Sequence, residues 1–508
     1  MTDTAPLNEA WRRLDPRMLV VGPVKNLMQL LPFLLVVLLT GRSGNLTQVW
    51  FAVGGAAVVV LAGVLRWRTT RYRITDERVE LHTGWLRRER RSVPRDRIRT
   101  VDLNASLLHR IFGLSVVQVG SATGASSGLD RSARMDLDAV TTAEAERLRR
   151  VLLDRASVAA TPSEQPSVEI ARLDWAWLRF APLTFSALAG VGALGGAVFN
   201  LLVEAGVDPR DVGVVADAAR SVAMAPLWVG IGLAGAALLV VAVVGAVVLF
   251  AERWYGYRLT REPDGSLRVR HGLLTKRSLS VSHERLRGAE ITEPLLLRAG
   301  RGAQARALST GLRDGGSGAL APPAPRAETH RVAAAALRAD PAEVTRAPLR
   351  RHPRAAFRRR LTRAVLPAAA LVAGAWLVDP WWAGAGVTSL VLLPAAVWLA
   401  VDRYRGLGHA LTARHLVTRI GGLRRSTVAL QREGVIGWTF RQSIFQRRAG
   451  VVTAEAVTAA GRGGYLVLDV APDDAVALAD AVTRDLFAPF RSAPMRTSTV
   501  MTLQNTKK

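Results

Sequence analysis

Residues 72–88 read YRITDERVELHTGWLRR, and related stretches occur at two later places in the chain. Residues 257–277 read YRLTREPDGSLRVRHGLLTKR, and residues 409–425 read HALTARHLVTRIGGLRR. Each stretch has an apolar residue followed by Thr, a polar turn, an alternating apolar strand, a glycine, a leucine and two basic residues. The second stretch is longer around PDG, which is a hairpin-turn signal. This self-similarity predicts three copies of one structural unit.

The copies keep a common register beyond this stretch. Nine residues after Gly84, Gly272 and Gly421 the chain is apolar, and it is apolar again five residues further on. Twelve residues beyond that position each copy has an arginine: Arg110, Arg298 and Arg447. The apolar alternation predicts half-buried strands of an antiparallel sheet.

A helical pattern closes each copy. The three patterns lie at residues 141–154, 327–339 and 473–487. In the first, Thr141 and Glu144 have the spacing of a capping box. Several strands followed by one helix is the order expected for a small bent sheet whose open end is closed by a helix.

An apolar hairpin precedes each copy. A helix needs about 20 mostly apolar residues to cross a bilayer. Six runs reach or approach this length: 26–40, which is longer if it begins near Met18, 48–65, 180–203, 224–250, 364–379 and 381–401. The first and fifth are short enough to be buried core helices instead, whereas 224–250 has 27 residues without a charge.

The charges that flank the six runs predict their orientation. The segments that join the two helices of each hairpin contain few Lys or Arg residues, whereas the outer ends are rich in them. Examples of the basic outer ends are Arg66, Arg68, Arg172, Arg358 and Arg363. Because positive flanks stay on the cytoplasmic side, we expect a multi-pass protein with both termini and all large polar segments in the cytoplasm.

The order of apolar hairpin, YRIT, Gly-x-Leu-x-basic, SVPRDRI and LLHRIFGL resembles the bacterial pleckstrin-homology-like, membrane-flanked domain family in its multi-copy, YdbT-like form. The first copy matches best, through Tyr72, Thr75, Gly84, Val93, Pro94, Ile98, Arg110 and Gly113. The second copy departs from the pattern at RAGRGAQA, residues 298–305. The resemblance implies a bacterial plasma membrane protein with small PH-like antiparallel β-barrel domains, each capped by a C-terminal helix, and it implies little chemistry.

These observations predict an α-helical membrane protein with about six transmembrane helices in three hairpins and three cytoplasmic PH-like domains. The expected segments are hairpin 18–65, domain 66–156, linker 157–178, hairpin 179–250, domain 251–345 with a disordered insertion near 313–326, hairpin 361–401, domain 402–490 and disordered tail 491–508.

The formal net charge of +27 makes nucleic acid, anionic lipid and acidic proteins candidate partners. Lysine occurs only four times, and abundant Arg with Ala, Val and Gly is also typical of a GC-rich genome. We therefore weigh where the arginines lie, not how many there are. Few aromatic residues accompany the basic clusters, so stacking platforms for nucleic acid are not expected.

The sequence favours a non-enzymatic protein without metal or cofactor. It has no cysteine, and its eight histidines lack the spacing of a zinc protease site. No phosphate-binding loop and no recurring acidic pair is found. Ion pathways need ionisable residues at membrane depth, and the apolar runs have almost none. A transporter or lipid-handling membrane protein regulated by its cytoplasmic domains remains the alternative.

The basic residues that recur after the strand turn are candidates for contacting anionic lipid headgroups: Arg87, Arg88, Arg90, Arg91, Lys276, Arg277, Arg424 and Arg425. Each basic residue near an anionic surface contributes about 1 kcal/mol, and tethering by the hairpins raises the effective concentration. A solvated hairpin under high arginine usage explains the same residues equally well. A second expected partner is a smaller single-domain PH-like membrane protein that pairs with exposed sheet edges.

Overall fold

The structure is a computed structural model that describes residues 11–22, 24, 46–75, 77–84, 88–95, 98–121, 134–153, 167–184, 196, 227–310, 318–378 and 383–483. The chain divides into two compact units. The first contains residues 1–347, 421–429 and 459–463, and the second contains residues 348–420, 430–458 and 464–508.

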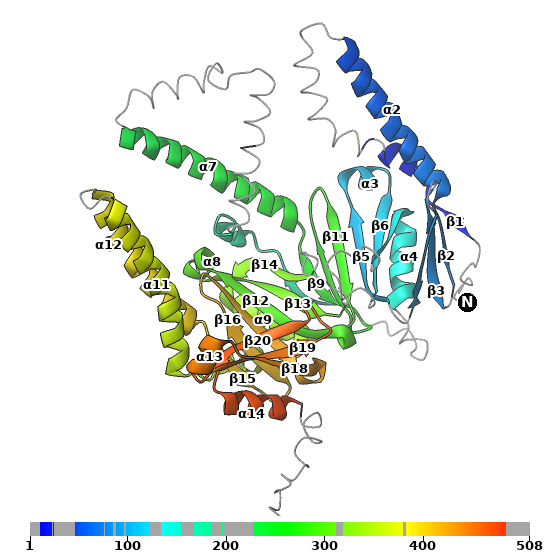
Figure 1. Cartoon of the computed structure of the whole chain (residues 1–508). Helices are drawn as coiled ribbons and strands as arrows, with labels where there is room; N and C mark the ends of the chain where they lie inside the picture. Colours follow the sequence, from blue (N-terminus) through cyan, green and yellow to red (C-terminus); the bar gives the residue numbers. More distant parts are fainter. Residues whose placement is uncertain are drawn as a thin grey trace, which may run out of the picture. The chain divides into compact units, whose positions relative to one another are not determined.

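The first copy consists of two antiparallel sheets and a closing helix (Figure 1). One sheet has the order β1-β2-β3-β4, and β5, β6 and β7 form the other. The elements are β1 (Arg12–Arg13), β2 (Arg71–Ile74), β3 (Arg78–Thr83), β4 (Glu89–Pro94), β5 (Ile98–Ala105), α3 (Leu107–Ile111), β6 (Leu114–Ser121), β7 (Arg134–Thr141) and α4 (Thr142–Leu153). This arrangement confirms the antiparallel strands and the closing helix predicted from the sequence.

The core of the first copy follows from the predicted alternation. Val79 and Leu81 of β3 and Val117 and Val119 of β6 are buried in one apolar cluster. Helix α4 covers this cluster with Leu148 and other apolar residues on one face. The Thr141 hydroxyl accepts a hydrogen bond from the Glu144 backbone N–H at 3.3 Å, so this half of the predicted capping box is confirmed.

The second copy repeats this plan. Its elements are β8 (Val168–Arg172), β9 (Arg258–Arg261), β10 (Leu267–His271), β11 (Lys276–Val281), β12 (Leu286–Pro294), α8 (Leu295–Ala299), β13 (Gly302–Ser309), β14 (Ala319–Pro325), α9 (Arg326–Leu337) and the short α10 (Pro341–Val344). The predicted turn at PDG is confirmed, because the Glu262 N–H donates to the Ser266 carbonyl oxygen at 2.9 Å across it.

Two segments expected to be linker or disordered contain strands. Residues 168–172 form β8, which pairs with β9 and thereby gives that strand a second hydrogen-bonded neighbour. Residues 319–325 form β14, which pairs with β13 through small Ala and Pro residues. Residues 154–166 and 311–317 lie outside the described residues, as does the tail from residue 484.

The third copy is divided between the two units. The first unit holds residues 421–429, most of β17 (Arg424–Gln431). The second unit holds β15 (Gly408–Leu411) paired with β16 (His415–Ile420), and a sheet of order β18-β19-β20. The remaining elements are β18 (Val435–Arg441), α13 (Ile444–Arg448), β19 (Val452–Thr458), β20 (Gly464–Val470) and α14 (Pro472–Val482).

Consecutive copies join through their sheets. β5 of the first copy pairs antiparallel with β11 of the second, with Arg277 opposite Asn104 and Leu279 opposite Asp102 (Figure 1). The resulting sheet has the order β7-β6-β5-β11-β10-β9-β8. At the next joint β12 of the second copy is hydrogen-bonded to β17 of the third. A continuous sheet across a joint removes two exposed strand edges at once.

In the described ranges, four long helices accompany the sheets: α2 (Leu46–Thr69), α7 (Leu227–Trp254), α11 (Arg354–Val378) and α12 (Ala383–Arg405). Among the described residues two segments are long and apolar enough to cross a membrane, Gly235–Trp254 and Arg354–Leu377, where the sequence predicted six. The predicted runs at 26–40 and 180–203 lie almost entirely outside the described residues.

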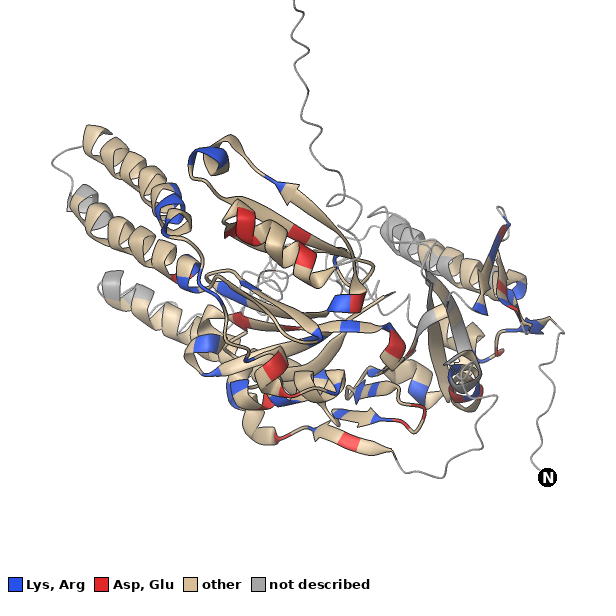
Figure 2. Cartoon of the chain, turned by 90° about the horizontal axis from the view of Figure 1, so that it is seen from below, with Lys and Arg blue, Asp and Glu red and all other residues tan. Residues whose placement is uncertain are grey.

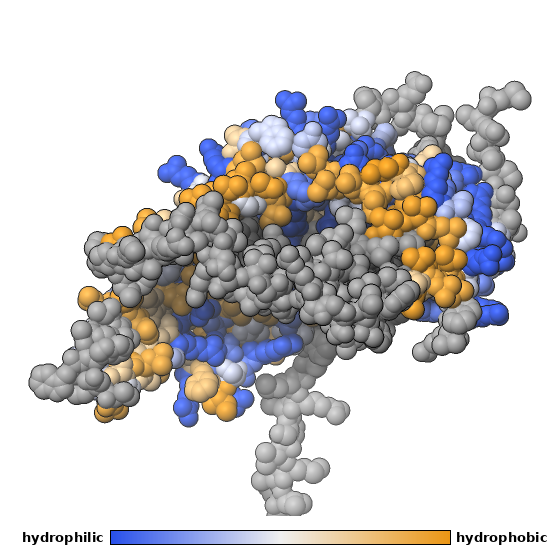
Figure 3. All heavy atoms as spheres, turned by 90° about the horizontal axis from the view of Figure 1, so that it is seen from above, coloured by the Kyte–Doolittle hydropathy of each residue, from blue (hydrophilic) through white to orange (hydrophobic). Residues whose placement is uncertain are grey.

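The candidate spans carry their apolar residues on the surface. Leu238 and Val241 of α7 and Leu371 of α11 are exposed. Figure 3 shows hydrophobic residues, in orange, on the surface of the described part of the chain. In Figure 2 the long helices lack charges along most of their length, and their Lys and Arg residues lie toward one end. A helix with an exposed apolar surface of this kind fits a lipid environment better than water.

Candidate lipid-headgroup surface

The turn between β10 and β11 is fixed against the end of α7. The Leu273 N–H donates to the Glu252 carbonyl oxygen at 2.8 Å, and the Gly272 N–H donates to the Tyr255 carbonyl oxygen at 2.9 Å. Gly272 has φ 111°, which favours glycine. A Cβ atom there would lie 2.0 Å from the Thr275 carbonyl oxygen. The glycine therefore makes the turn tight enough to contact the helix end.

The turn presents apolar side chains followed by basic ones. Leu273 and Leu274 are 41% and 48% exposed although they lie beside the end of a candidate membrane helix. Lys276 and Arg277 follow at the start of β11 and are also exposed. Apolar side chains directed outward beside cations are typical of a surface that lies at the boundary between acyl chains and headgroups.

The end of α7 adds further positive charge and aromatic rings. Arg253 lies close enough to Arg277 and Arg306 for their charges to interact. Two aromatic side chains beside it, Trp175 and Tyr255, are about half exposed, with ring centroids 6.1 Å apart. Trp and Tyr are enriched where transmembrane helices meet the headgroup region. Cations and interfacial aromatics therefore occur together at this end of the helix.

His271 connects the turn to the helix. Its Nδ1 lies 2.8 Å from the Arg253 carbonyl oxygen, and its ring packs on Trp254 at 4.7 Å between centroids. Burial lowers the pKa of His271 to about 4, and the charges of Arg277 and Arg253 act in the same direction. The ring is therefore neutral at neutral pH and serves as a packing and hydrogen-bonding residue.

Acid should weaken this part of the protein. Because the folded pKa of His271 is about 4 and its ordinary value is 6.5, only the unfolded chain binds a proton there between these values. Its contribution to stability is complete above pH 6.5 and decreases as the pH falls toward 4. We expect the melting temperature of the full chain to drop between pH 7.5 and 5, and to drop by roughly 2–4 °C less in His271→Gln. An unchanged drop in the variant would contradict this.

The described members of the predicted headgroup set lie at or beside the start of β4, β11 and β17, one strand in each copy. Arg87 lies outside the described residues, and Arg88 and Arg90 are exposed at or beside the start of β4. Arg91 forms an ion pair with Glu89 at 2.6 Å. Arg424 is exposed and Arg425 is half-buried at the start of β17. In the second copy, Lys276 and Arg277 lie beside a candidate membrane helix.

Sequence reasoning missed several parts of this surface. It gave no role to Arg253, Arg306, Trp175, Tyr255 or the exposed leucines. A signal was present, because WAWLRF at 175–180 and ERWYGY at 252–257 flank the second predicted hairpin with aromatic and basic residues.

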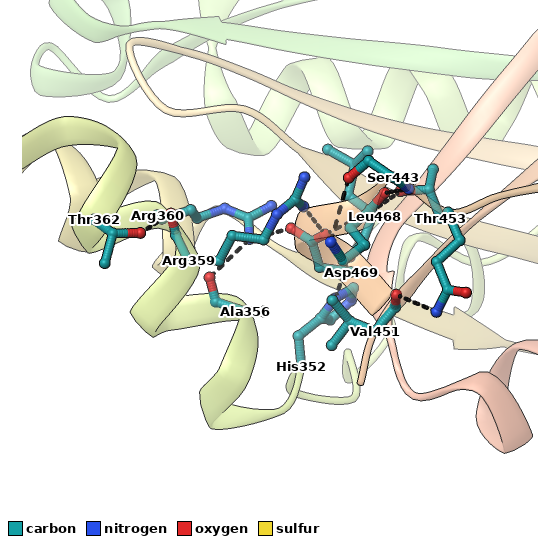
Figure 4. A network of polar contacts seen from close by, with 12 residues as sticks. His352, Ala356, Arg359, Arg360, Thr362, Ser443, Val451, Thr453, Leu468 and Asp469 are labelled. Atoms are coloured by element: carbon teal, nitrogen blue, oxygen red, sulfur yellow. Dashed lines mark hydrogen bonds and ion pairs between the residues drawn. The ribbon is translucent and has the colours of Figure 1, made fainter. Parts of the chain in front are cut away.

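A second polar cluster lies where α11 approaches the sheet of the third copy (Figure 4). Asp469 of β20 is 3% exposed and accepts hydrogen bonds from Arg359, from Arg360 at 2.7 Å and from Gln446 at 2.9 Å. Nearby, the Nδ1 of His352 lies 2.7 Å from the Leu468 carbonyl oxygen. One buried carboxylate thus accepts from three side chains, two of them on α11, so the cluster fixes the start of α11 to the domain.

The arrangement of two antiparallel sheets and a closing helix, repeated three times beside apolar helices, is matched by a known family. The bacterial PH domain family matches residues 20–156, 211–353 and 361–485. The chain belongs to this family and contains three copies of its domain.

A named relative has the same extent. Over 457 residues, 85% of this chain and 88% of the relative, the chain is 22% identical to the UPF0699 transmembrane protein YdbT of Bacillus subtilis (strain 168). No solved structure matches the chain. The relative's name and the two candidate spans together indicate a membrane-associated protein.

Proposed function

We propose that this protein is a non-enzymatic membrane scaffold whose tethered PH-like domains contact anionic lipid headgroups. The observation that carries the proposal is the β10–β11 turn. It is hydrogen-bonded to the end of α7, exposes two leucines, and is followed by Lys276 and Arg277 beside Arg253. Anionic lipid headgroups would supply negative charge to this cluster of cations.

The proposed topology has six spans with the domains and both termini in the cytoplasm of a bacterium. α7 and α11 supply two spans. α2 and α12, of 24 and 23 residues, and the two predicted runs outside the described residues supply the others. The distribution of Lys and Arg supports this orientation. It places the basic turns of all three domains on the side of the membrane where anionic lipids attract them.

A scaffold fits the helices better than a transporter does. α7 has no charged residue from Leu227 to Ala251, and α11 has none from Ala364 to Val378. Transport pathways for ions and protons use ionisable side chains at this depth. These two helices therefore favour anchoring over transport.

Lipid selectivity is the test. We expect phosphatidylglycerol to raise the melting temperature of the detergent-purified full chain more than phosphatidylcholine does. In the double variant Lys276→Ala, Arg277→Ala this difference should fall, because two contacts of about 1 kcal/mol each are lost. The expected reduction is roughly 4–8 °C. At high salt the difference between the two lipids should disappear in the unaltered chain as well.

The matched control is the double variant Arg78→Ala, Arg448→Ala, which removes the same charge from exposed positions outside the surface. It should respond to phosphatidylglycerol as the unaltered chain does. An equal response to both lipids, or equal losses in the two double variants, would contradict the headgroup surface.

A further inference from the structure

The two joints between copies are built from equivalent parts. At the first, β5 pairs with β11, and the Arg110 guanidinium donates to the Leu273 carbonyl oxygen at 2.5 Å. At the second, β12 is hydrogen-bonded to β17, and Arg298 donates to the Gly422 carbonyl oxygen at 3.3 Å. Leu273 and Gly422 each directly follow the glycine of the strand turn. The joint therefore consists of a strand edge and an arginine on one copy, and a strand edge and a turn carbonyl on the next.

The first half of this joint is the strand edge with its arginine. The third copy repeats this half, and there it has no partner among the described residues. β18 occupies the position of β5 and β12 and is hydrogen-bonded on one side alone, to β19. Arg447 occupies the position of Arg110 and Arg298 and is exposed.

The exposure of one equivalent side chain in the three copies shows that the third copy lacks a neighbouring strand. Leu103 and Ile291, in the joined strands β5 and β12, are 8% and 0% exposed, whereas Phe440 of β18 is 40% exposed. Ile436 of the same strand is 64% exposed. An exposed edge strand beside apolar side chains is a template for pairing with another strand.

The second half of the joint is the strand edge that follows the glycine turn, and the first copy repeats it. β4 occupies the position of β11 and β17 and ends its sheet, with β3 as its hydrogen-bonded neighbour. Within the part of the chain that the structure describes, one copy of each half is therefore unused.

We propose that β18 of one chain pairs antiparallel with β4 of a second copy of this chain, so that molecules associate head to tail. The register of the first joint, transferred to the equivalent residues, puts Arg90 opposite Phe440 and Glu89 opposite Arg441. The second pair brings opposite charges together. Because the two surfaces differ, the contact is heterologous and generates a row or a ring of chains in the membrane plane.

This inference extends the scaffold function and does not depend on headgroup contact. The partner is a second copy because both internal joints show which surface covers this strand, and β4 presents that surface at the end of its sheet. Arg447 would then lie beside the Gly84 turn of the neighbouring chain, as Arg110 and Arg298 lie beside the turns at Gly272 and Gly421.

Disulfide cross-linking tests the proposal, since the chain has no cysteine of its own. Two differently tagged full-length chains, one with Arg90→Cys and one with Phe440→Cys, are expressed together and oxidised in membranes. We expect a cross-linked species that carries both tags, at a yield at least five times that of Arg90→Cys with Asp473→Cys, an exposed position on α14. Adding Arg447→Ala to the Phe440→Cys chain should lower the yield severalfold, and Arg448→Ala should not.

Four results would overturn the proposal. Cross-linking of Phe440→Cys to itself would indicate a two-fold dimer through β18. A disulfide within one chain that carries both cysteines would indicate that β4 and β18 of the same molecule meet. Cross-linking no greater than the control, or cross-linking of Phe440→Cys to a smaller chain alone, would show that a second copy does not cover β18. The yield should be the same when both chains also carry Lys276→Ala and Arg277→Ala. This control separates pairing of the strands from headgroup binding.

Discussion

Replacing Asp469 by alanine is expected to destabilise the second unit by about 3–5 kcal/mol, the range found when one partner of a buried ion pair is removed. The carboxylate is 4% exposed and its two arginine partners are each 12% exposed. Without it, two guanidinium groups and the Gln446 amide lose this acceptor in a place that water reaches poorly. A protein of ordinary stability has roughly 5–15 kcal/mol in total, so the loss should be visible as unfolding of this unit.

The Asp469 backbone adds a second cost. Its φ is 53°, in the left-handed region, where a residue other than Gly, Asn or Asp is disfavoured by about 1–2 kcal/mol. Asp469→Asn accepts this backbone and keeps one oxygen acceptor but removes the charge. We therefore expect Asp469→Asn to be destabilised less than Asp469→Ala and more than the original chain.

Protease sensitivity of the full chain in detergent, followed by fragment mass, locates the unfolding to the second unit. Asp473→Ala is the matched control, because Asp473 is exposed in the first turn of α14. Its expected cost is at most about 1 kcal/mol, from the helix dipole. If Asp469→Ala were no more sensitive than this control, the anchoring role of the cluster would be wrong.

The sequence predicted the repeated parts of the fold well because they are local. Alternating apolar residues, the turn glycines and the closing helices each depend on neighbours within about ten positions, and the structure has them at the predicted places. The strand at residues 319–325 was missed because ALAPPAP has the composition of a loop. It becomes a strand through pairing with β13, a contact that periodicity does not encode.

The joints and the polar cluster could not be predicted from local patterns either, because they depend on contacts between distant parts of the chain. Arg110, Arg298 and Arg447 were aligned from the sequence, yet their contacts reach a turn in the following copy, 163 positions away for Arg110. The headgroup residues were chosen for their charge and for their recurrence after the strand turn. The structure adds the helix end that brings Lys276 and Arg277 beside Arg253, which no spacing within the motif reveals.

Replacing Gly272 by alanine should cost about 3 kcal/mol or more, because backbone strain and a steric clash add together. The φ of 111° is unfavourable for a residue with a Cβ atom. That atom would also lie 2.0 Å from one backbone atom and 2.9 Å from another, the carbonyl oxygen and carbon of Thr275. Backbone cannot move aside as a flexible side chain can, so the turn must open. Opening breaks the hydrogen bonds that hold it against Glu252 and Tyr255.

Gly256 provides a matched comparison, because its φ is 62° and nothing lies within 4 Å of the position that a Cβ atom would take there. Gly256→Ala should therefore cost only the left-handed penalty of about 1–2 kcal/mol. Melting temperatures of the two full-length variants should differ by roughly 2–8 °C. The Gly272 variant should also lose part of its preference for phosphatidylglycerol, since the leucines and cations no longer lie beside α7. Equal melting temperatures would show that the turn relaxes without cost, and an unchanged lipid preference in a destabilised Gly272→Ala would separate headgroup contact from the geometry of the turn.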